Sequence, residues 1–268
     1  MTLHLTKHHG LGNDFLVALE STNPGLRADP ARSRALCDRH TGVGADGVLH
    51  GMAGSAGADV EMVLHNSDGS AAEISGNGIR CLAQAWLRAS GMTDGAGLVG
   101  EVVVIDTPAG RRTLEVRSVT GPDEMVLSVD MGQVRPGPEL PAGWAIPGLR
   151  VATRSVGNPH LVALSSGAEV DLRQVGADWE NLVPGGINVH VMKVTGNDRI
   201  ELSHWERGAG LTLACGSGAT VAAAVAHDWG LVGTDVRVDL PGGSGQVHLG
   251  ATAVLIGPTV SVAEVSVS

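Results

Sequence analysis

Two short glycine-containing segments place a potentially reactive side chain just before an apolar, alanine-rich run. They read Ser75-Gly76-Asn77-Gly78 and Cys215-Gly216-Ser217-Gly218. The apolar runs predict helices, so each segment is a helix start. The first N–H groups of a helix lack intrahelical partners and the dipole is positive there, so each start can bind an anion. Two such starts facing one cleft could hold a carboxylate while one side chain removes a proton from a carbon and the other returns one.

The two side chains differ in acidity. Cys215 carries a thiol, whose unperturbed pKa of about 8.5 is expected to fall further at a helix N-terminus. The alternative for Cys215 is a buried structural cysteine, which is the common fate of a single Cys. Ser75 carries a hydroxyl, which stays protonated at neutral pH unless a neighbouring base takes its proton. It can donate a hydrogen bond or relay a proton, but it is no ready base.

Composition excludes several classes of protein. The 268 residues suit one large or two ordinary domains, and 43% hydrophobic residues allow a sizeable core. A net charge of −10 without a Lys/Arg block argues against nucleic-acid binding. No apolar stretch reaches the ~18–20 residues of a membrane-spanning helix, and the N-terminus lacks a signal-peptide core. The three cysteines have neither disulfide-framework nor zinc-site spacing, which predicts no metal and a reducing, cytoplasmic compartment.

Period-two alternation predicts strands over most of the chain. The expected strands are Leu3–His8, Phe15–Leu19, Val60–Asn66, Glu101–Thr107, Arg112–Val119, Met125–Met131, Arg150–Val156, His160–Leu164, Ile187–Val194, Ile200–His204, Val236–Leu240, Gly245–Leu249 and Val260–Val267. The expected helices are Pro30–Arg39, Asn77–Ser90, Val170–Leu182 and Ser217–Trp229.

The two glycine motifs lie about half a chain length apart, which indicates two similar halves. Each half is expected to be a mostly antiparallel sheet wrapped around one central helix, an α+β fold. The N-terminal half is placed at 1–121 and is completed by the last strand, about 260–268. The C-terminal half is placed at 122–259, with the break near Gly121-Pro122. The alternative is a chance repeat of Gly-x-Gly in a glycine-rich chain.

Six further polar segments interrupt the strand pattern, and each taken singly is an ordinary turn. They are His9–Phe15, Gly42–Gly47, Asn66–Ser70, Gly157–His160, Asn188 and Glu206–Gly210. In order and spacing they and the two glycine motifs resemble the diaminopimelate epimerase family over essentially the whole chain. Gly-Asn-Gly-x-Arg-Cys and Ala-Cys-Gly-Ser-Gly are the most specific pieces.

The resemblance implies a fold of two pseudo-symmetric halves and a homodimer. It also implies a cofactor-independent enzyme that interconverts LL- and meso-diaminopimelate in lysine and peptidoglycan precursor biosynthesis. Members of the family use two cysteines, one on each face of the α-carbon. Cys215 matches the second of them. The first falls on Ser75, a departure that puts full activity in doubt.

The family's binding residues carry over by position to Asn13, Asn66, Gly76, Asn77, Asn158, Asn188, Glu206, Arg207, Gly216 and Ser217. Arg207 would pair with a distal carboxylate and Glu206 would accept from an ammonium group. The asparagine side chains supply donors and acceptors, and the helix-start N–H groups face the reacting carboxylate. His160 matches a histidine near the site, with a satisfied structural histidine as its alternative.

Three explanations of Ser75 stay open. It is a single replacement in an otherwise intact epimerase, a natural variant in which serine still serves, or a sign of drift to a one-base reaction or to binding alone. The corresponding alternative functions are a related amino-acid racemase or dehydratase, and a catalytically silent metabolite-binding protein.

Overall fold

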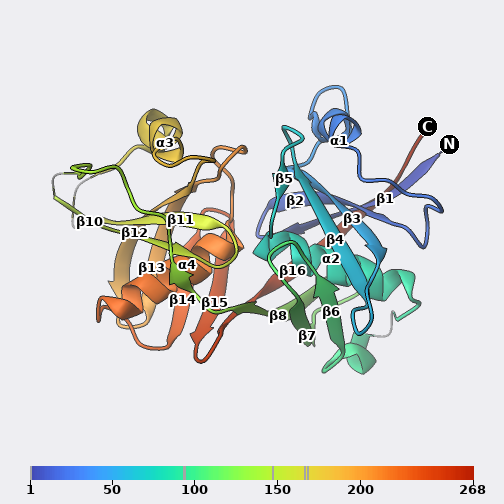
Figure 1. Ribbon diagram of the computed structural model, residues 1–268. Helices are drawn as coiled ribbons and strands as arrows, with labels where there is room; N and C mark the ends of the chain where they lie inside the picture. The colour runs from blue at the N-terminus through green and yellow to red at the C-terminus, as the bar shows by residue number, and fades with distance from the viewer. Residues whose placement is uncertain (1, 93–94, 147, 166, 168) are drawn as a thin grey trace. The chain divides into compact units, whose positions relative to one another are not determined.

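The structure is a computed structural model that describes residues 2–92, 95–146, 148–165, 167 and 169–268 (Figure 1). Its contacts divide the chain into two compact units. Unit 1 comprises Met1–Asp130 and Ile256–Ser268, and unit 2 comprises Met131–Leu255. The sequence placed the break near Gly121-Pro122, whereas this division lies later, after Asp130. Strand β8 (Glu124–Gly132) pairs antiparallel with β7 (Arg112–Val119), which keeps most of β8 in the first unit.

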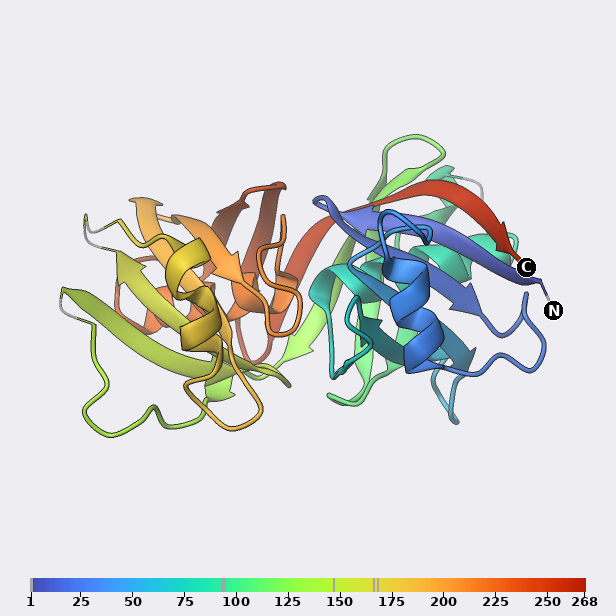
Figure 2. The ribbon, with the colours of Figure 1, turned by 90° about the horizontal axis from the view of Figure 1, so that it is seen from above.

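Unit 1 contains a sheet in the order β1-β2-β3-β4-β6-β7-β8. Its other strands are β1 (Leu3–Gly10), β2 (Asn13–Leu19), β3 (Gly47–Ala53), β4 (Val60–Asn66), β5 (Ala71–Ala72) and β6 (Val102–Asp106). From β1 to β7 the neighbouring pairs are antiparallel, parallel, antiparallel, parallel and antiparallel. The last strand, β16 (Ala253–Val267), pairs antiparallel with β1, so that Leu3 lies opposite Val267 and the two chain ends lie side by side (Figures 1 and 2).

Unit 2 repeats this order of pairings. Its strands are β9 (Arg135–Pro136), β10 (Leu149–Ser155), β11 (Pro159–Ser165), β12 (Asn188–Gly196), β13 (Arg199–Trp205), β14 (Asp235–Leu240) and β15 (Gly243–Leu249). From β10 to β15 the pairs are again antiparallel, parallel, antiparallel, parallel and antiparallel. In both units the long helix enters after the fourth strand of this series, as the expectation of two similar halves requires.

Each sheet wraps around one buried helix, which confirms the predicted α+β class. Helix α2 (Gly76–Ala89) packs on β1, β2 and β3, and α4 (Gly216–Asp228) packs on β11, β12 and β15. A helix that is apolar on every side belongs in a core, and α4 fits this rule because its Ala and Val residues are buried all round. The shorter helices α1 (Pro30–Cys37) and α3 (Leu172–Glu180) lie on the outside of the sheets (Figure 2).

The predicted helices match the observed ones to within two residues at each end. Strand β3 was missed because Gly47, His50 and Gly51 break its apolar alternation. Gly51 is needed there since a Cβ atom at this position would lie 2.6 Å from Leu19 Cδ2. A short 3-10 turn, Gly95–Leu98, was also missed. In the described part of the chain, no helix combines the length and the apolar character that crossing a membrane requires.

Replacing Leu82 in the middle of α2 tests the central-helix core. Leu82 is fully buried, so Leu82→Ala should lower the free energy of unfolding by about 2–5 kcal/mol through lost burial and a residual cavity. Urea unfolding followed by circular dichroism measures the change. Val99→Ala is the control, because Val99 is 53% exposed and its replacement should cost less than ~0.5 kcal/mol. Equal effects of the two substitutions would contradict the placement of α2.

Candidate active site

Ser75 and Cys215 occupy equivalent positions as the N-cap residues of α2 and α4. Their backbone angles are similar, with φ −129° and ψ 122° at Ser75 and φ −124° and ψ 104° at Cys215. The carbonyl of each accepts the first helical hydrogen bond at 2.9 Å, from Ile79 N and Ala219 N. The side chains differ, because Ser75 Oγ accepts a 3.0 Å bond from Gly78 N whereas Cys215 makes no side-chain cap bond. The Cys215 thiol therefore lacks the short cap bond that the Ser75 hydroxyl makes, and the Gly218 amide influences it only weakly.

Burial and the Glu206 carboxylate together raise the pKa of the Cys215 thiol. Cys215 is only 2% exposed, and loss of water raises its pKa well above the ordinary value. The charge of Glu206, together with the hydrogen bond that the thiol donates to it, raises the pKa further. The Gly218 amide and the Ser217 hydroxyl act in the opposite direction but are weaker. The expected lowering of this pKa by the helix N-terminus is therefore wrong, because burial and Glu206 outweigh the dipole.

A tight loop after β13 holds Glu206 next to the thiol. Glu206 N donates to Gly210 O at 2.7 Å, and Gly210 N donates back to Glu206 O at 2.8 Å. The Thr212 hydroxyl donates to a carboxylate oxygen of Glu206. Helix α3 fixes the loop from outside, since Gly208 N donates to Glu180 Oε1 at 3.0 Å. These contacts hold both the backbone and the carboxylate of Glu206 in place beside Cys215.

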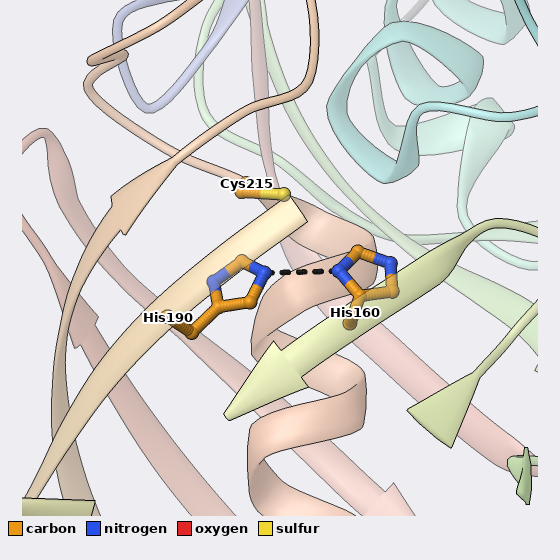
Figure 3. A group of neighbouring side chains, drawn as sticks. All are labelled: His160, His190 and Cys215. Atoms are coloured by element: carbon orange, nitrogen blue, oxygen red, sulfur yellow. Dashed lines mark hydrogen bonds between the residues drawn. The ribbon is translucent and has the colours of Figure 1, made fainter. Parts of the chain in front are cut away.

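A chain of hydrogen bonds runs from Ser217, at the start of α4, into the core of unit 2. Asn158 Nδ2 donates to Ser217 Oγ at 3.3 Å, and Asn158 Oδ1 lies 2.8 Å from His160 Nε2. His160 Nδ1 lies 2.9 Å from His190 Nε2, and both rings lie beside Cys215 (Figure 3). The amide oxygen can only accept, so His160 carries its proton on Nε2 and its Nδ1 accepts from His190 Nε2–H.

The buried histidines are neutral. Loss of water lowers the pKa of His160 to about 3, helped by the charge of Arg207, and the pKa of His190 also falls well below its usual value. The His190 ring packs on the first turn of α4, where a Cβ atom at Gly218 would lie 2.0 Å from His190 Cε1. A third imidazole, His204, stacks on His190 with centroids 6.1 Å apart. The second glycine of the Cys215 motif is thus required for packing.

Asn188 and Arg207 form a further pair in unit 2. Asn188 Oδ1 accepts from Arg207 N at 3.0 Å, and Asn188 Nδ2 donates to Pro159 O at 3.0 Å. The Arg207 guanidinium donates to Gly185 O at 3.3 Å. Asn188 therefore fixes the backbone from which the Arg207 side chain extends.

The predicted binding residues of unit 1 form a separate network at the start of α2. Asn13 Nδ2 donates to Asp46 Oδ2 at 2.8 Å, and Asn13 Oδ1 accepts from Asn77 Nδ2 at 3.2 Å. Asn77 Oδ1 accepts from the buried Arg80 guanidinium at 2.6 Å. Asn66 lies apart, at the end of β4, and its Nδ2 donates to Ser70 Oγ at 3.0 Å.

The structure therefore brings together, in unit 2, six predicted residues around the start of α4: Asn158, His160, Glu206, Cys215, Gly216 and Ser217. In unit 1 it brings together Ser75, Gly76 and Asn77 with Asn13. Sequence reasoning missed His190, which shares one face of β12 with Asn188 at a spacing of two residues. That spacing was a usable signal. Nothing local marked Thr212 as the partner of Glu206.

Solved structures share this fold. A hydroxyproline epimerase from Agrobacterium vitis superposes with a TM-score of 0.72 at 19% identity, covering 99% of this chain and 92% of that one. A PhzF-family phenazine biosynthesis protein from Bacillus anthracis gives a TM-score of 0.70 at 14% identity, covering 100% and 99%. The fold class is thus the one common to these epimerase and PhzF structures.

Sequence comparison gives the family. A family model described as diaminopimelate epimerase matches residues 5–136 and 152–260. The diaminopimelate epimerase of a Synechocystis species is 36% identical over 94% of this chain and 92% of its own length. That of Synechococcus sp. JA-3-3Ab is 39% identical over 92% and 90%. The chain belongs to the diaminopimelate epimerase family.

Replacing Glu206 by Gln tests the control of the thiol. The substitution removes a negative charge beside Cys215, so the pKa of the thiol should fall and its thiolate fraction should rise. Each unit of decrease raises that fraction about tenfold at a pH below the pKa. We expect alkylation of Cys215 by iodoacetamide at pH 8 to become roughly tenfold faster, as measured by mass spectrometry of its peptide.

The matched control is Glu201→Gln on the exposed face of β13, which should leave the alkylation rate of Cys215 unchanged. A Glu206→Gln protein that is alkylated at the rate of the unaltered chain would show that Glu206 does not act on the thiol.

Proposed function

We propose that this protein is an amino-acid epimerase that interconverts LL- and meso-diaminopimelate by removing and returning the α-hydrogen without a cofactor. The observation that carries the proposal is the Cys215 thiol at the N-terminus of α4, buried and hydrogen-bonded to the Glu206 carboxylate. Membership of the diaminopimelate epimerase family supports the substrate. The proposed catalytic residues are Cys215 and Ser75.

Proton transfer through Cys215 needs a base strong enough to attack a weak carbon acid. A thiolate that has lost its hydration is a stronger base than one in water, so the raised pKa of Cys215 suits this task. Glu206 accepts the thiol proton, and the Sγ lone pair then takes the α-hydrogen as a proton, which leaves the electron pair on the α-carbon. Charge that spreads into the substrate carboxylate is stabilised by the first N–H groups of α4, those of Gly216 and Ser217.

Ser75 is proposed to serve the opposite face of the same α-carbon, with the α2 N–H groups of Gly76 and Asn77 as the second anion site. Its Oγ accepts from Gly78 N, and this hydrogen bond does not use the hydroxyl proton, which is proposed to face the substrate. A hydroxyl can return a proton to a carbanion, but it removes one far less readily than a thiolate does. The two directions of the reaction are therefore expected to differ in rate.

The remaining polar residues are proposed to bind the amino and carboxylate groups at the second end of the substrate. Arg207 offers a guanidinium that can pair with a distal carboxylate in a forked geometry, and Asn188 holds its backbone in place. Asn13, Asn66 and Asn158 supply amide donors and acceptors. The Glu206 carboxylate accepts a hydrogen bond from the Cys215 thiol. Its predicted contact with a substrate ammonium group is therefore proposed as a second role of the same carboxylate.

A second candidate rests on Ser75 itself. Because this hydroxyl already caps α2, the chain could carry out a one-base reaction, such as elimination by a dehydratase, or bind a metabolite without turnover. Related racemases are a further possibility within the same fold. Chiral chromatography of products from a panel of amino acids separates these candidates from the epimerase.

The setting of the enzyme is also a proposal. The three cysteines are free thiols, which suits a reducing compartment such as the cytoplasm. Family resemblance suggests a homodimer, which light scattering of the purified protein would test. The amino-acid substrate is the proposed partner, with no nucleic acid or membrane partner, and the proposed mechanism uses no cofactor.

Replacing Ser75 by Cys should complete the site. A second thiol restores an effective acid/base group on the opposite face, so kcat/KM for diaminopimelate should rise by ~10²-fold or more. Exchange of the α-hydrogen with solvent deuterium, followed by NMR from each stereoisomer, measures both directions. Ser90→Cys at the other end of α2 is the control and should give no increase.

An unchanged rate in Ser75→Cys together with tight substrate binding would favour the silent binding protein. If neither stereoisomer of diaminopimelate binds to either form, the epimerase assignment is wrong.

Oxidation tests the proposal that positions 75 and 215 act on one substrate. In the Ser75→Cys form the two thiols could join in a disulfide, which would close the site. Mild oxidant should therefore abolish ligand binding by Ser75→Cys and leave the unaltered chain much less affected, as measured by calorimetry. Reduction should restore binding. Equal sensitivity of the two forms would count against the shared substrate.

A further inference from the structure

Three buried donor groups lie close together at the start of α4. His160, His190 and Cys215 each offer one ligand atom, and these atoms lie within 4.8 Å of one another. The two imidazole nitrogens that face each other, His160 Nδ1 and His190 Nε2, are 2.9 Å apart (Figure 3). Imidazole and thiolate are the ligands that zinc and its soft relatives prefer.

One unpartnered nitrogen lets both imidazoles become ligands. His160 holds its proton on Nε2, where Asn158 Oδ1 accepts it, so its Nδ1 lone pair is available. His190 Nε2 holds the proton that lies between the rings. His190 Nδ1 is buried and has no hydrogen-bond partner among the residues that the structure describes. Moving the proton of His190 from Nε2 to Nδ1 therefore breaks no other hydrogen bond, and it frees the Nε2 lone pair with no change in charge.

We propose that His160 Nδ1, His190 Nε2 and Cys215 Sγ form a binding site for a soft divalent cation of the zinc type. The cation takes the place of the proton shared by the two imidazoles, on the side facing the sulfur. Two nitrogens 2.9 Å apart can both approach a zinc ion at about 2.0–2.1 Å. Binding shifts the His190 proton to Nδ1 and releases one proton, that of the thiol, to solvent.

The surroundings suit such a cation. His160 keeps its Nε2–H bond to Asn158, and an outer hydrogen bond of this kind orients a metal-bound histidine. One thiolate and two neutral imidazoles leave a single positive charge on a divalent ion. The carboxylate of Glu206, next to the sulfur, offsets that charge. The fourth position of a tetrahedral ion stays open to water or to Glu206.

The site has a consequence for the reaction, and this part alone rests on the proposed function. A cation on Sγ uses the lone pair that would take the α-hydrogen. Zinc should therefore inhibit α-hydrogen exchange reversibly, and a chelator should restore it. Binding of the cation itself does not depend on the protein being an epimerase.

Cobalt(II) provides a spectroscopic probe of the site without substrate. The full-length chain is reduced, freed of metal with a chelator and titrated anaerobically with Co²⁺. We expect a sulfur-to-cobalt charge-transfer band in the near ultraviolet, visible bands of a tetrahedral ion, and displacement of both by Zn²⁺. Addition of Zn²⁺ to weakly buffered protein should release one proton per ion bound.

Variants assign the ligands. Cys215→Ser should abolish the charge-transfer band, and His190→Phe should weaken cobalt binding by at least ~10-fold. The matched controls replace a buried cysteine of α2 (Cys81→Ser) and a buried histidine of unit 1 (His50→Phe). Both substitutions should leave the cobalt spectrum unchanged. Circular dichroism checks that each variant is folded.

Absence of the charge-transfer band in the unaltered chain would overturn the proposal, as would its survival in Cys215→Ser. A protein that exchanges the α-hydrogen in chelator but does not bind cobalt contradicts only the metal site. A protein that binds cobalt through these residues but neither binds nor exchanges diaminopimelate contradicts only the proposed function.

Discussion

A thiol and a carboxylate that share one proton in a nearly dry setting are the interaction on which the candidate site of unit 2 depends. Cys215 has lost almost all contact with water, and Glu206 accepts its hydrogen bond. In the loop after β13, the backbone pair with Gly210 positions Glu206, and the hydroxyl of Thr212 donates to its carboxylate. The cost of dehydrating the sulfur is what makes its anion a strong base.

The start of α2 has the same backbone geometry as the start of α4 but carries a different side chain. The N-cap geometry of Ser75 nearly reproduces that of Cys215, and the strands around both helices pair in the same order. The serine hydroxyl, however, is tied to the first turn of its own helix. A serine at an N-cap stabilises the helix by about 1 kcal/mol, so the hydroxyl at this position makes a structural contribution that the Cys215 thiol does not make.

Local features of the sequence were enough to predict the helices and most strands, because caps, glycines and period-two patterns act within a few residues. Asp29, for example, caps α1 as Pro30 at the first helical position led us to expect. The pKa of Cys215 could not be predicted in this way. The sequence shows its place at a helix start, but burial by the sheet and the approach of Glu206 exist only once β13 and α4 have packed. The pairing of His190 with His160 likewise depends on the parallel register of β11 and β12, which places His160 opposite Asn188.

The return of β16 to pair with β1 constrains the order of events during synthesis on the ribosome. The first unit needs residues 256–268 to complete its sheet, and these residues leave the ribosome only after all of the second unit. The second unit is continuous in sequence and can therefore close first. Until β16 arrives, the edge of β1 has unpaired backbone groups, and such an edge can pair with a strand of another chain.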